Sequence, residues 1–250
     1  MPHATFAPPW LTARPIAHRG LHDLKNGIIE NTLGACDAAI AGNYAIECDL
    51  QISRDGEAVL FHDDTLDRVT LASGEVSNYS LAELKKVKFR HGPESIPALS
   101  EVLDLVDGQV PLVIELKPQW NGDDRLARRT LAALEFYTGL HALMSFDPGA
   151  IAAIKTLSPG TVRGFISERG FDPFYDRLSP ALRRDIRTLA CLSRITPHFL
   201  SLRAGELPWA PVAQLRSQGM PVITWTIHSP AEAAIALRHC DQITFENFRA

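Results

Sequence analysis

Short apolar runs of strand length alternate with longer segments of helical periodicity along most of the chain. The runs predict strands at Pro15–His18, Ala45–Leu50, Leu112–Lys117, His141–Phe146, Thr161–Ile166, Phe199–Arg203, Val222–Ile227 and Asp241–Phe245. Helical spacing falls between them, at Thr32–Ala41, Ser100–Val106, Asp124–Phe136, Pro148–Leu157, Val212–Gln218 and Pro230–Arg238. Strands that alternate with helices favour β-α units and a parallel sheet. Eight such units in 250 residues predict an α/β fold of the (β/α)8 or TIM barrel type.

Two polar segments interrupt this alternation. The stretch between Phe61 and Pro97 is rich in turn residues and contains one short helical pattern around Leu81–Lys86, which predicts a small insertion after the second strand, at about residues 62–97. A second loop at Gly170–Pro180 precedes an arginine-rich helical pattern at Ala181–Leu189. Because no repeat or long linker divides the chain, we expect a single domain over residues 1–250.

Composition and charge exclude several classes of protein. A formal net charge of −4 lacks the basic footprint of a general nucleic-acid binder. No apolar run is long enough for a transmembrane segment, and the first residues do not have the pattern of a secretory signal. The four cysteines are scattered without C-x-x-C spacing, which is typical of buried, reduced thiols. We therefore expect a cytoplasmic protein, while the oligomeric state has no sequence signal.

Polar residues gather at the ends of the first three predicted strands, in His18-Arg19-Gly20, Glu47-Cys48-Asp49 and Glu115-Leu116-Lys117. The carboxyl ends of barrel strands carry the active site in this fold. In the second and third of these groups the polar residues are two apart, so their side chains point to the same face of the strand. Three carboxylates on neighbouring strands are costly to bury unless something compensates their charge.

Two kinds of compensation fit this pattern. Glu47, Asp49 and Glu115 supply the oxygen ligands that Mg²⁺ and Ca²⁺ prefer, and Mn²⁺ is a further candidate. Alternatively, the first two carboxylates pair with arginines and the third with Lys117 in a buried ionic network. The spacing alone leaves both interpretations open.

His62 ends the apolar run that follows the second strand, so two histidines, His18 and His62, are expected to flank the carboxylates. Paired histidines can act as general acid and general base near neutral pH. Arg19 and Lys117 provide positive charge suited to a phosphate group. Each residue taken alone also fits a structural role, but together they predict metal-assisted hydrolysis of a phosphate ester.

The chain resembles the glycerophosphodiester phosphodiesterases, and more closely the bacterial cytoplasmic type. The resemblance lies in His18-Arg19-Gly20, Glu30-Asn31-Thr32-Leu33, Glu47-Cys48-Asp49, His62-Asp63-Asp64-Thr65-Leu66-Asp67-Arg68-Val69-Thr70, Ile96-Pro97-Ala98-Leu99, Glu115-Leu116-Lys117-Pro118 and Trp225-Thr226-Ile227. These motifs occur in the family's order with similar spacing. The first motif is weak by itself, whereas the ordered set is specific.

The resemblance implies a (β/α)8 barrel with a small insertion after the second strand. It also implies metal-dependent cleavage of a small glycerophosphodiester to glycerol 3-phosphate and an alcohol. Either the glycerol 2-hydroxyl, through a cyclic phosphate, or a water molecule would be the nucleophile. The identity of the alcohol cannot be read from the sequence.

Carried over by position, the resemblance gives each candidate residue a role. The metal ligands would be Glu47, Asp49 and Glu115, the acid/base pair His18 and His62, and the phosphate-binding residues Arg19 and Lys117. Trp225 resembles the family's pocket-wall aromatic, although plain barrel packing explains it equally well.

Some residues depart from the family's pattern or remain open. Where many members end the last strand with Thr-Asp-x-Pro, this chain has Thr244-Phe245-Glu246-Asn247-Phe248, which puts a substrate contact there in doubt. His228 stands where the family often has asparagine, and it and His22 fit either the pocket or a solvent-facing loop. Asn31 and Thr32 are expected to cap the following helix, whereas the role of Glu30 is open, with orientation of His18 or of Arg19 as the two candidates.

Three other functions compete with this one. A phospholipase D-like enzyme acting on lysophospholipids or sphingolipids would expose apolar loops near the site, and the candidates are Trp120 and Phe171–Tyr175. A non-catalytic binder of phosphorylated ligands would be favoured by loss of a proposed site residue, and none is lost. An unrelated barrel enzyme, such as a sugar-phosphate isomerase, conflicts with the ordered motifs.

Overall fold

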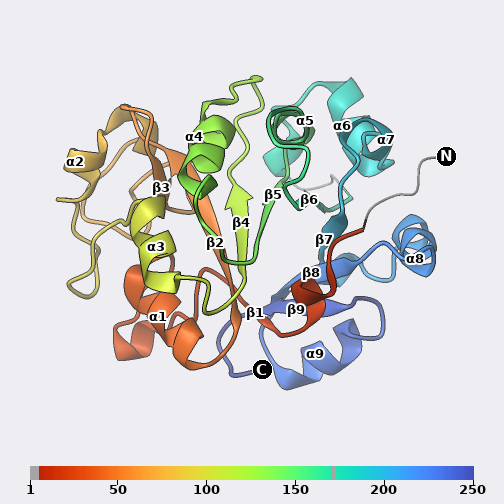
Figure 1. Ribbon diagram of the computed structural model, residues 1–250, viewed down its shortest axis with the longest axis horizontal. Helices are drawn as coiled ribbons and strands as arrows, with labels where there is room; N and C mark the ends of the chain where they lie inside the picture. The colour runs from red at the N-terminus through yellow and green to blue at the C-terminus, as the bar shows by residue number, and fades with distance from the viewer. Residues whose placement is uncertain (1–5, 170–172) are drawn as a thin grey trace.

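The computed structural model describes residues 6–169 and 173–250 and forms a closed barrel of parallel strands ringed by helices (Figure 1). The barrel strands are β1 (Ile16–Ala17), β2 (Ala45–Ile52), β4 (Leu112–Leu116), β5 (His141–Ser145), β6 (Arg163–Ser167), β7 (Phe199–Arg203), β8 (Val222–Ile227) and β9 (Gln242–Phe245). Each pairs in parallel with the next, and β1 pairs with both β2 and β9, which closes the sheet. The predicted (β/α)8 barrel is confirmed.

Apart from a short helix at Leu192–Ile195, which the periodicity does not predict, the helices fall where they are predicted, within a few residues at each end. They are α1 (Leu33–Ala41), α2 (Leu81–Leu84), α3 (Leu99–Val106), α4 (Arg125–Leu134), α5 (Pro148–Leu157), α6 (Pro180–Arg187), α7 (Leu192–Ile195), α8 (Ala210–Ser217) and α9 (Pro230–Ala236). Short 3-10 turns add η1 (Pro9–Thr12), η2 (Leu24–Asn26), η3 (Val76–Asn78), η4 (Pro173–Tyr175) and η5 (Ala204–Glu206). Helices α5, α6 and α9 begin at a capping Asp or Ser followed by proline, a sequence that favours helix initiation.

Alternate residues of each strand face two separate apolar layers. On β2, Ile46, Cys48 and Leu50 point outward into the layer between the barrel and its helices. Inward-facing Ala45 packs with residues such as Phe199 and Ile223 in the barrel interior. Because both faces of a barrel strand are covered, the strands read as nearly continuous apolar runs in the sequence.

The amino-terminal end of the barrel is closed by the chain that precedes β1. Leu11 of η1 is buried with the interior apolar residues. Nearby, the Gln242 side-chain amide donates to the Thr12 carbonyl oxygen at 3.0 Å. The other end of the barrel, where the strands finish, carries the polar residues described below.

The insertion after the second strand begins as a continuation of that strand. β2 pairs at its far end with a short antiparallel strand, β3 (Ala58–Leu60), which the sequence does not predict because it has only three residues. The following segment carries η3 and α2. It packs around an apolar cluster of its own, formed by Ile29, Val59, Phe61, Leu66, Val76, Leu84, Phe89 and Ile96.

Among the described residues, no helix combines the length and apolar character that crossing a membrane would require. All four cysteines are buried and unpaired, as expected for reduced thiols.

Candidate active site

A small pocket at the carboxyl ends of the barrel strands brings all the predicted site residues together. It has a volume of about 120 Å³. Its lining includes His18, Arg19, Glu47, Asp49, His62, Glu115, Lys117 and Trp225. They lie on β2, β4 and β8 or shortly after β1, β3 and β4, which brings them to the carboxyl end of the barrel.

The three carboxylates form a buried cluster. Glu47 and Asp49 share the inner face of β2, and the register places Asp49 directly beside Glu115 on β4. One carboxylate oxygen from each lies within 4.8 Å of the other two, although each residue is at most 7% exposed. Burial, together with the charges of Asp49 and Glu115, raises the pKa of Glu47 well above its usual value. A cation between these oxygens would remove that penalty.

Two basic side chains partly compensate the cluster. The Lys117 ammonium lies 2.9 Å from Glu115 Oε1 and 3.4 Å from Asp49 Oδ1, and Arg19 Nε lies 3.5 Å from Asp49 Oδ2. Burial alone would raise the pKa of Asp49, but the positive charges of Lys117, His62 and Arg19 outweigh it and hold that pKa well below its usual range. Of the ion pairs considered from the sequence, those of Asp49 with an arginine and of Glu115 with Lys117 are present, whereas among the described residues Glu47 contacts Arg19 only through the backbone N–H. Two cationic side chains do not neutralise three carboxylates, so the negative charge that remains favours binding of a divalent ion.

Asn31 holds Asp49 through its side chain, which corrects the expectation that it caps α1. Its amide nitrogen donates to Asp49 Oδ2 at 2.9 Å, and its amide oxygen accepts from the Asp49 backbone N–H at 3.0 Å. Thr32 alone is the cap, accepting from the Ala35 N–H at 3.3 Å. The left-handed backbone of Asn31, with φ of 55°, turns the side chain toward β2 instead of the helix.

Arg19 is held in place by both its backbone and its side chain. Its N–H donates to Glu47 Oε2 at 2.9 Å, and its guanidinium donates to Glu30 Oε1 at 2.8 Å. Glu30 also accepts from Arg68 of the insertion at 2.6 Å and 3.0 Å. Glu30 therefore orients Arg19, one of the two roles left open for it by the sequence.

Each of the two histidines has a carboxylate on Nδ1. His18 Nδ1 lies 2.6 Å from Glu246 Oε2, and His62 Nδ1 lies 2.6 Å from Asp63 Oδ1. Burial lowers the pKa of His18, and the hydrogen bond to Glu246 offsets part of that effect. Both rings line the pocket, so the structure brings them to either side of the carboxylate cluster.

Glu246 is the residue that the sequence analysis missed. It directly follows β9, at the position where the family pattern is broken. Its carboxylate also lies 3.4 Å from His22 Nε2 and 3.4 Å from His228 Nδ1. His22 is thus inside this polar cluster, whereas the His228 side chain is 48% exposed at its edge. A carboxylate directly after the last strand of a predicted barrel was the available signal.

The opposite wall of the pocket comes from β5 to β9 and is mainly apolar. Trp225 both lines the pocket and packs edge-on against Phe146, with ring centroids 5.5 Å apart, so its two interpretations coexist. Beyond the residues that line the pocket, the rings of Trp120 and Phe174 pack edge-on, with centroids 5.8 Å apart. Of the apolar loop predicted at Phe171–Tyr175, Phe171 and Asp172 lie outside the described residues.

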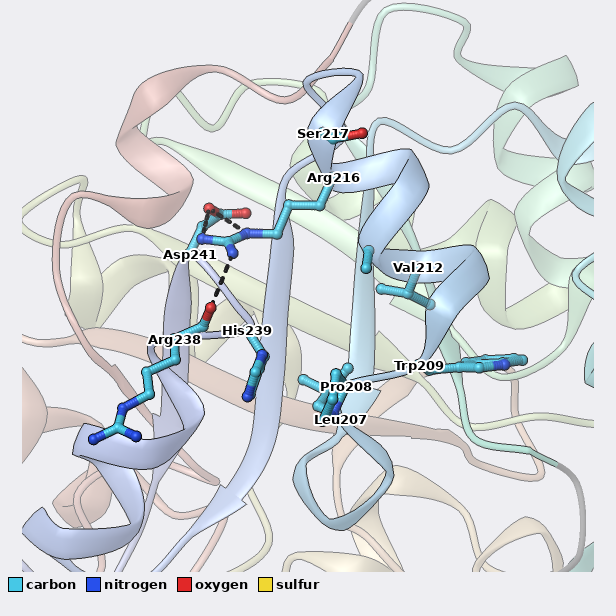
Figure 2. Close-up of a pocket in the computed structure, with 10 residues that line it drawn as sticks. Leu207, Pro208, Trp209, Val212, Arg216, Ser217, Arg238, His239 and Asp241 are labelled. Atoms are coloured by element: carbon cyan, nitrogen blue, oxygen red, sulfur yellow. Dashed lines mark hydrogen bonds and ion pairs between the residues drawn. The ribbon is translucent and has the colours of Figure 1, made fainter.

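A separate cavity of about 370 Å³ lies outside the barrel beside α8 (Figure 2). Two of its charged groups are already paired, because Arg216 Nε donates to Asp241 Oδ1 at 2.9 Å and the same guanidinium reaches the carbonyl oxygen of Arg238 (Figure 2). The guanidinium also donates to the carbonyl oxygen of Cys240 at 2.9 Å. None of the carboxylate-cluster residues lines it.

The closed barrel, with its polar pocket at the carboxyl ends of the strands, defines the protein as a (β/α)8-barrel enzyme, and the match to a family of phosphodiesterases makes it a phosphoric diester hydrolase. The glycerophosphoryl diester phosphodiesterase family model matches residues 18–242, and the chain belongs to that family.

Relatives agree with this assignment. A glycerophosphodiester phosphodiesterase of Bacillus subtilis is 30% identical over 243 residues, covering 87% of this chain and 77% of the relative. One from Caldanaerobacter subterraneus is 33% identical over 165 residues, covering 62% of this chain and 67% of the relative. Among solved structures, an Oleispira antarctica phosphodiesterase in complex with the product sn-glycerol-3-phosphate shares the fold, with a TM-score of 0.77 and 24% identity over 94% of this chain and 92% of its own.

Proposed function

We propose that the protein hydrolyses small glycerophosphodiesters to glycerol 3-phosphate and an alcohol, with a divalent metal ion as cofactor. The observation that carries this proposal is the pocket itself, where three buried carboxylates with oxygens within 4.8 Å of one another lie between two histidines and two basic side chains. The names of the relatives support the reaction, and the product complex of the Oleispira protein supports glycerol 3-phosphate as product.

The donor set fits a hard divalent cation. Glu47, Asp49 and Glu115 offer oxygen ligands only, which suits Mg²⁺, Ca²⁺ or Mn²⁺ better than structural zinc. When bound, such an ion would supply positive charge to the phosphoryl oxygens as charge builds up there. The remaining negative charge of the cluster, after Lys117 and Arg19, is the feature that favours its binding.

The chain's own groups divide the remaining work. Arg19 and Lys117 bind the phosphate oxygens, because their charges point into the pocket from opposite sides of Asp49. His18 and His62 transfer the protons, one removing the proton of the nucleophile and the other protonating the leaving alkoxide. Trp225 bounds the space for the substrate on the apolar wall. The same groups serve attack by the glycerol 2-hydroxyl or by water.

The test is hydrolysis of glycerophosphocholine and glycerophosphoethanolamine by EDTA-treated protein, with and without Mg²⁺, Ca²⁺ or Mn²⁺. Metal-dependent release of glycerol 3-phosphate is expected, with Glu47→Ala inactive as the matched control. A transient cyclic phosphate would identify the 2-hydroxyl as nucleophile. Absence of turnover with every diester and metal would overturn the proposal and favour a lysolipid substrate or a binding protein.

One observation favours lysophospholipids as a second candidate substrate class. Phe174 is 36% exposed and packs against Trp120 and against Phe146, which lines the pocket, so an apolar chain would have an aromatic surface to contact. Lysophosphatidylcholine is therefore included in the same assay.

The single-domain extent of residues 1–250 and the cytoplasmic location remain predictions.

A further inference from the structure

The carboxylate of Glu246 is the meeting point of three histidines from three different segments. His18 follows β1, His22 lies in the loop before η2, and His228 follows β8. Their ring nitrogens lie 2.6, 3.4 and 3.4 Å from the Glu246 oxygens. The Glu246 side chain is 19% exposed, so its charge is partly shielded from water and acts on these rings more strongly than a surface charge would.

The backbones on both sides of the shortest contact are fixed by the barrel. The His18 N–H donates to the carbonyl oxygen of Phe245 at 2.9 Å, and the Glu246 N–H donates to that of Ile227 at 3.0 Å. Both residues therefore continue the strand pairing of β1, β8 and β9. The Glu246 to His18 hydrogen bond is set by strand register, which holds the carboxylate on one defined nitrogen of the ring.

This contact determines which nitrogen of His18 faces the chemistry. A carboxylate accepts hydrogen bonds, so Nδ1 carries the hydrogen that it donates to Glu246. The other nitrogen, Nε2, faces the carboxylate cluster and lies 4.0 Å from Glu47 Oε2. In a neutral ring, Nε2 is then the nitrogen with the free lone pair. The ring thus presents its reactive nitrogen to the pocket before substrate arrives.

The second histidine has a similar partner in a different setting. Asp63 binds His62 Nδ1, but the same carboxylate also accepts from Arg68 Nε at 2.6 Å. In the described part of the chain, by contrast, no Arg or Lys forms an ion pair with Glu246. The Asn247 side-chain amide donates to Glu246 Oε1 at 3.3 Å, but the charged or ionisable partners described for Glu246 are histidine rings, with His18 at the shortest distance.

We propose that Glu246 is a positioning residue that fixes the tautomer and ring orientation of His18 for proton transfer. The inference rests on the proposed function, in which His18 exchanges a proton with the nucleophile or leaving group. Glu246 itself is not among the described residues that line the pocket. It acts through His18, and this dependence can be measured.

The kinetic test uses Glu246→Gln, Glu246→Asp, His18→Gln and the double variant Glu246→Gln/His18→Gln. Glu246→Gln should lower kcat by ~10- to 100-fold with KM changed by less than about twofold, as is typical when the partner of an essential histidine is lost. Glu246→Asp keeps the charge and should recover part of the rate. In the His18→Gln background, Glu246→Gln should cost nothing further, because the group that it positions is absent.

A matched control and a second readout keep the inference separate from the proposed function. Glu135→Gln removes the same charge from the exposed end of α4 and should leave kcat unchanged. Ring ¹⁵N NMR of His18 should show the Nδ1–H tautomer in the parent protein and its loss in Glu246→Gln, whether or not any diester is hydrolysed.

The outcomes are distinct. No turnover by the parent protein overturns the proposed function, and the tautomer measurement then decides the inference alone. Unchanged kcat in Glu246→Gln, losses that multiply in the double variant, or an unaltered His18 tautomer would each overturn the role of Glu246.

Discussion

Asn31 and Asp49 are joined by a reciprocal pair of hydrogen bonds, in which the amide of one residue contacts both the carboxylate and the backbone N–H of the other. Both groups are buried, so neither bond competes with water. The pair fixes the orientation of the central carboxylate in the acidic cluster. Outer contacts of this kind are commonly as important to a metal site as the ligands themselves.

Asn31→Asp should therefore weaken divalent-metal binding. The substitution keeps the size of the side chain and tolerates the left-handed backbone, but it replaces the N–H donor with a second carboxylate against Asp49. We expect ~10- to 100-fold weaker binding of Mn²⁺ or Mg²⁺ by titration calorimetry. Asn43→Asp is the matched control, because Asn43 has nearly the same φ of 56° but contacts Arg14 away from the cluster. Equal affinity in both variants would contradict the role of Asn31.

Two substitutions in the cluster should shift stability in opposite directions when metal is removed. The fold disfavours the charge of Glu47, whose pKa is raised by burial and by the neighbouring carboxylates. The fold favours the charge of Asp49, whose pKa is lowered by Lys117, His62 and Arg19 despite burial. In EDTA, Glu47→Gln should raise Tm and Asp49→Asn should lower it, by the equivalent of ~1 kcal/mol or more each.

The same two variants report on the metal. Saturating Mg²⁺ or Mn²⁺ should raise the Tm of the parent protein, by the equivalent of ~2.7 kcal/mol at a hundred times Kd. Both variants should lose most of that increase, and both should lose turnover. A parent protein whose Tm changes with neither Mg²⁺ nor Mn²⁺ would contradict the metal assignment, even if the stability changes in EDTA are as expected.

The barrel could be predicted from sequence because its signals are local. Strands buried on both faces leave apolar runs, and on β2 and β4 polar residues two apart interrupt those runs on the inner face. The same local rule brought Glu47, Asp49 and Glu115 into one cluster before any contact was known. Strand β3 was not predicted because a strand of three residues has too few positions to show a hydrophobic period.

Contacts between distant segments were not predictable in this way. The partner of His18 is 228 residues away along the chain, and only barrel closure between β1 and β9 brings Glu246 to it. Asn31 is of a residue type that commonly caps helices. Its contact with Asp49 on β2 depends on a left-handed backbone conformation that hydrophobic periodicity does not indicate. Local propensity was thus overridden at the site, where side chains serve the pocket and not their own element.

Gly20 should be irreplaceable by alanine. Its φ is +76°, and an added Cβ would come within 2.7 Å of the Ala35 backbone, which cannot move without shifting α1. Gly56 also has a positive φ, of +85°, but an added Cβ there meets nothing within 4 Å. We expect Gly56→Ala to cost ~1 to 2 kcal/mol from backbone strain alone. Gly20→Ala should cost ~1 to 3 kcal/mol beyond that from overpacking.

Urea unfolding of the two alanine variants measures this difference directly. Any loss of stability in Gly20→Ala should be accompanied by weaker metal binding, because the adjacent Arg19 N–H contacts Glu47. Equal urea midpoints for the two variants would contradict this prediction and would mean that α1 shifts to accommodate the added Cβ at little cost in free energy.

His198 sits outside the pocket and should make stability depend on pH. Its Nδ1 accepts from the Arg163 backbone N–H at 3.0 Å, which requires a neutral ring. Partial burial and the nearby Arg163 charge lower the pKa of His198 to about 4, from 6.5. Above pH 6.5 the ring is neutral in both the folded and unfolded states, so this histidine adds no pH dependence there.

As the pH falls from 6.5 toward 4, His198 is protonated in the unfolded chain but stays neutral in the folded protein, because its pKa is lower there. The free energy of unfolding therefore decreases over this interval. Because the ring is only partly buried, we expect a loss of about 1 kcal/mol between pH 7 and pH 5 from this residue. His198→Asn keeps an acceptor for the Arg163 N–H and removes the titration, so its unfolding free energy should fall less over that interval. Chemical denaturation of both proteins at pH 7 and pH 5 measures the difference. Parallel losses in parent and variant would show that His198 is protonated without cost in the fold, and that the acid sensitivity of the barrel lies in its carboxylates.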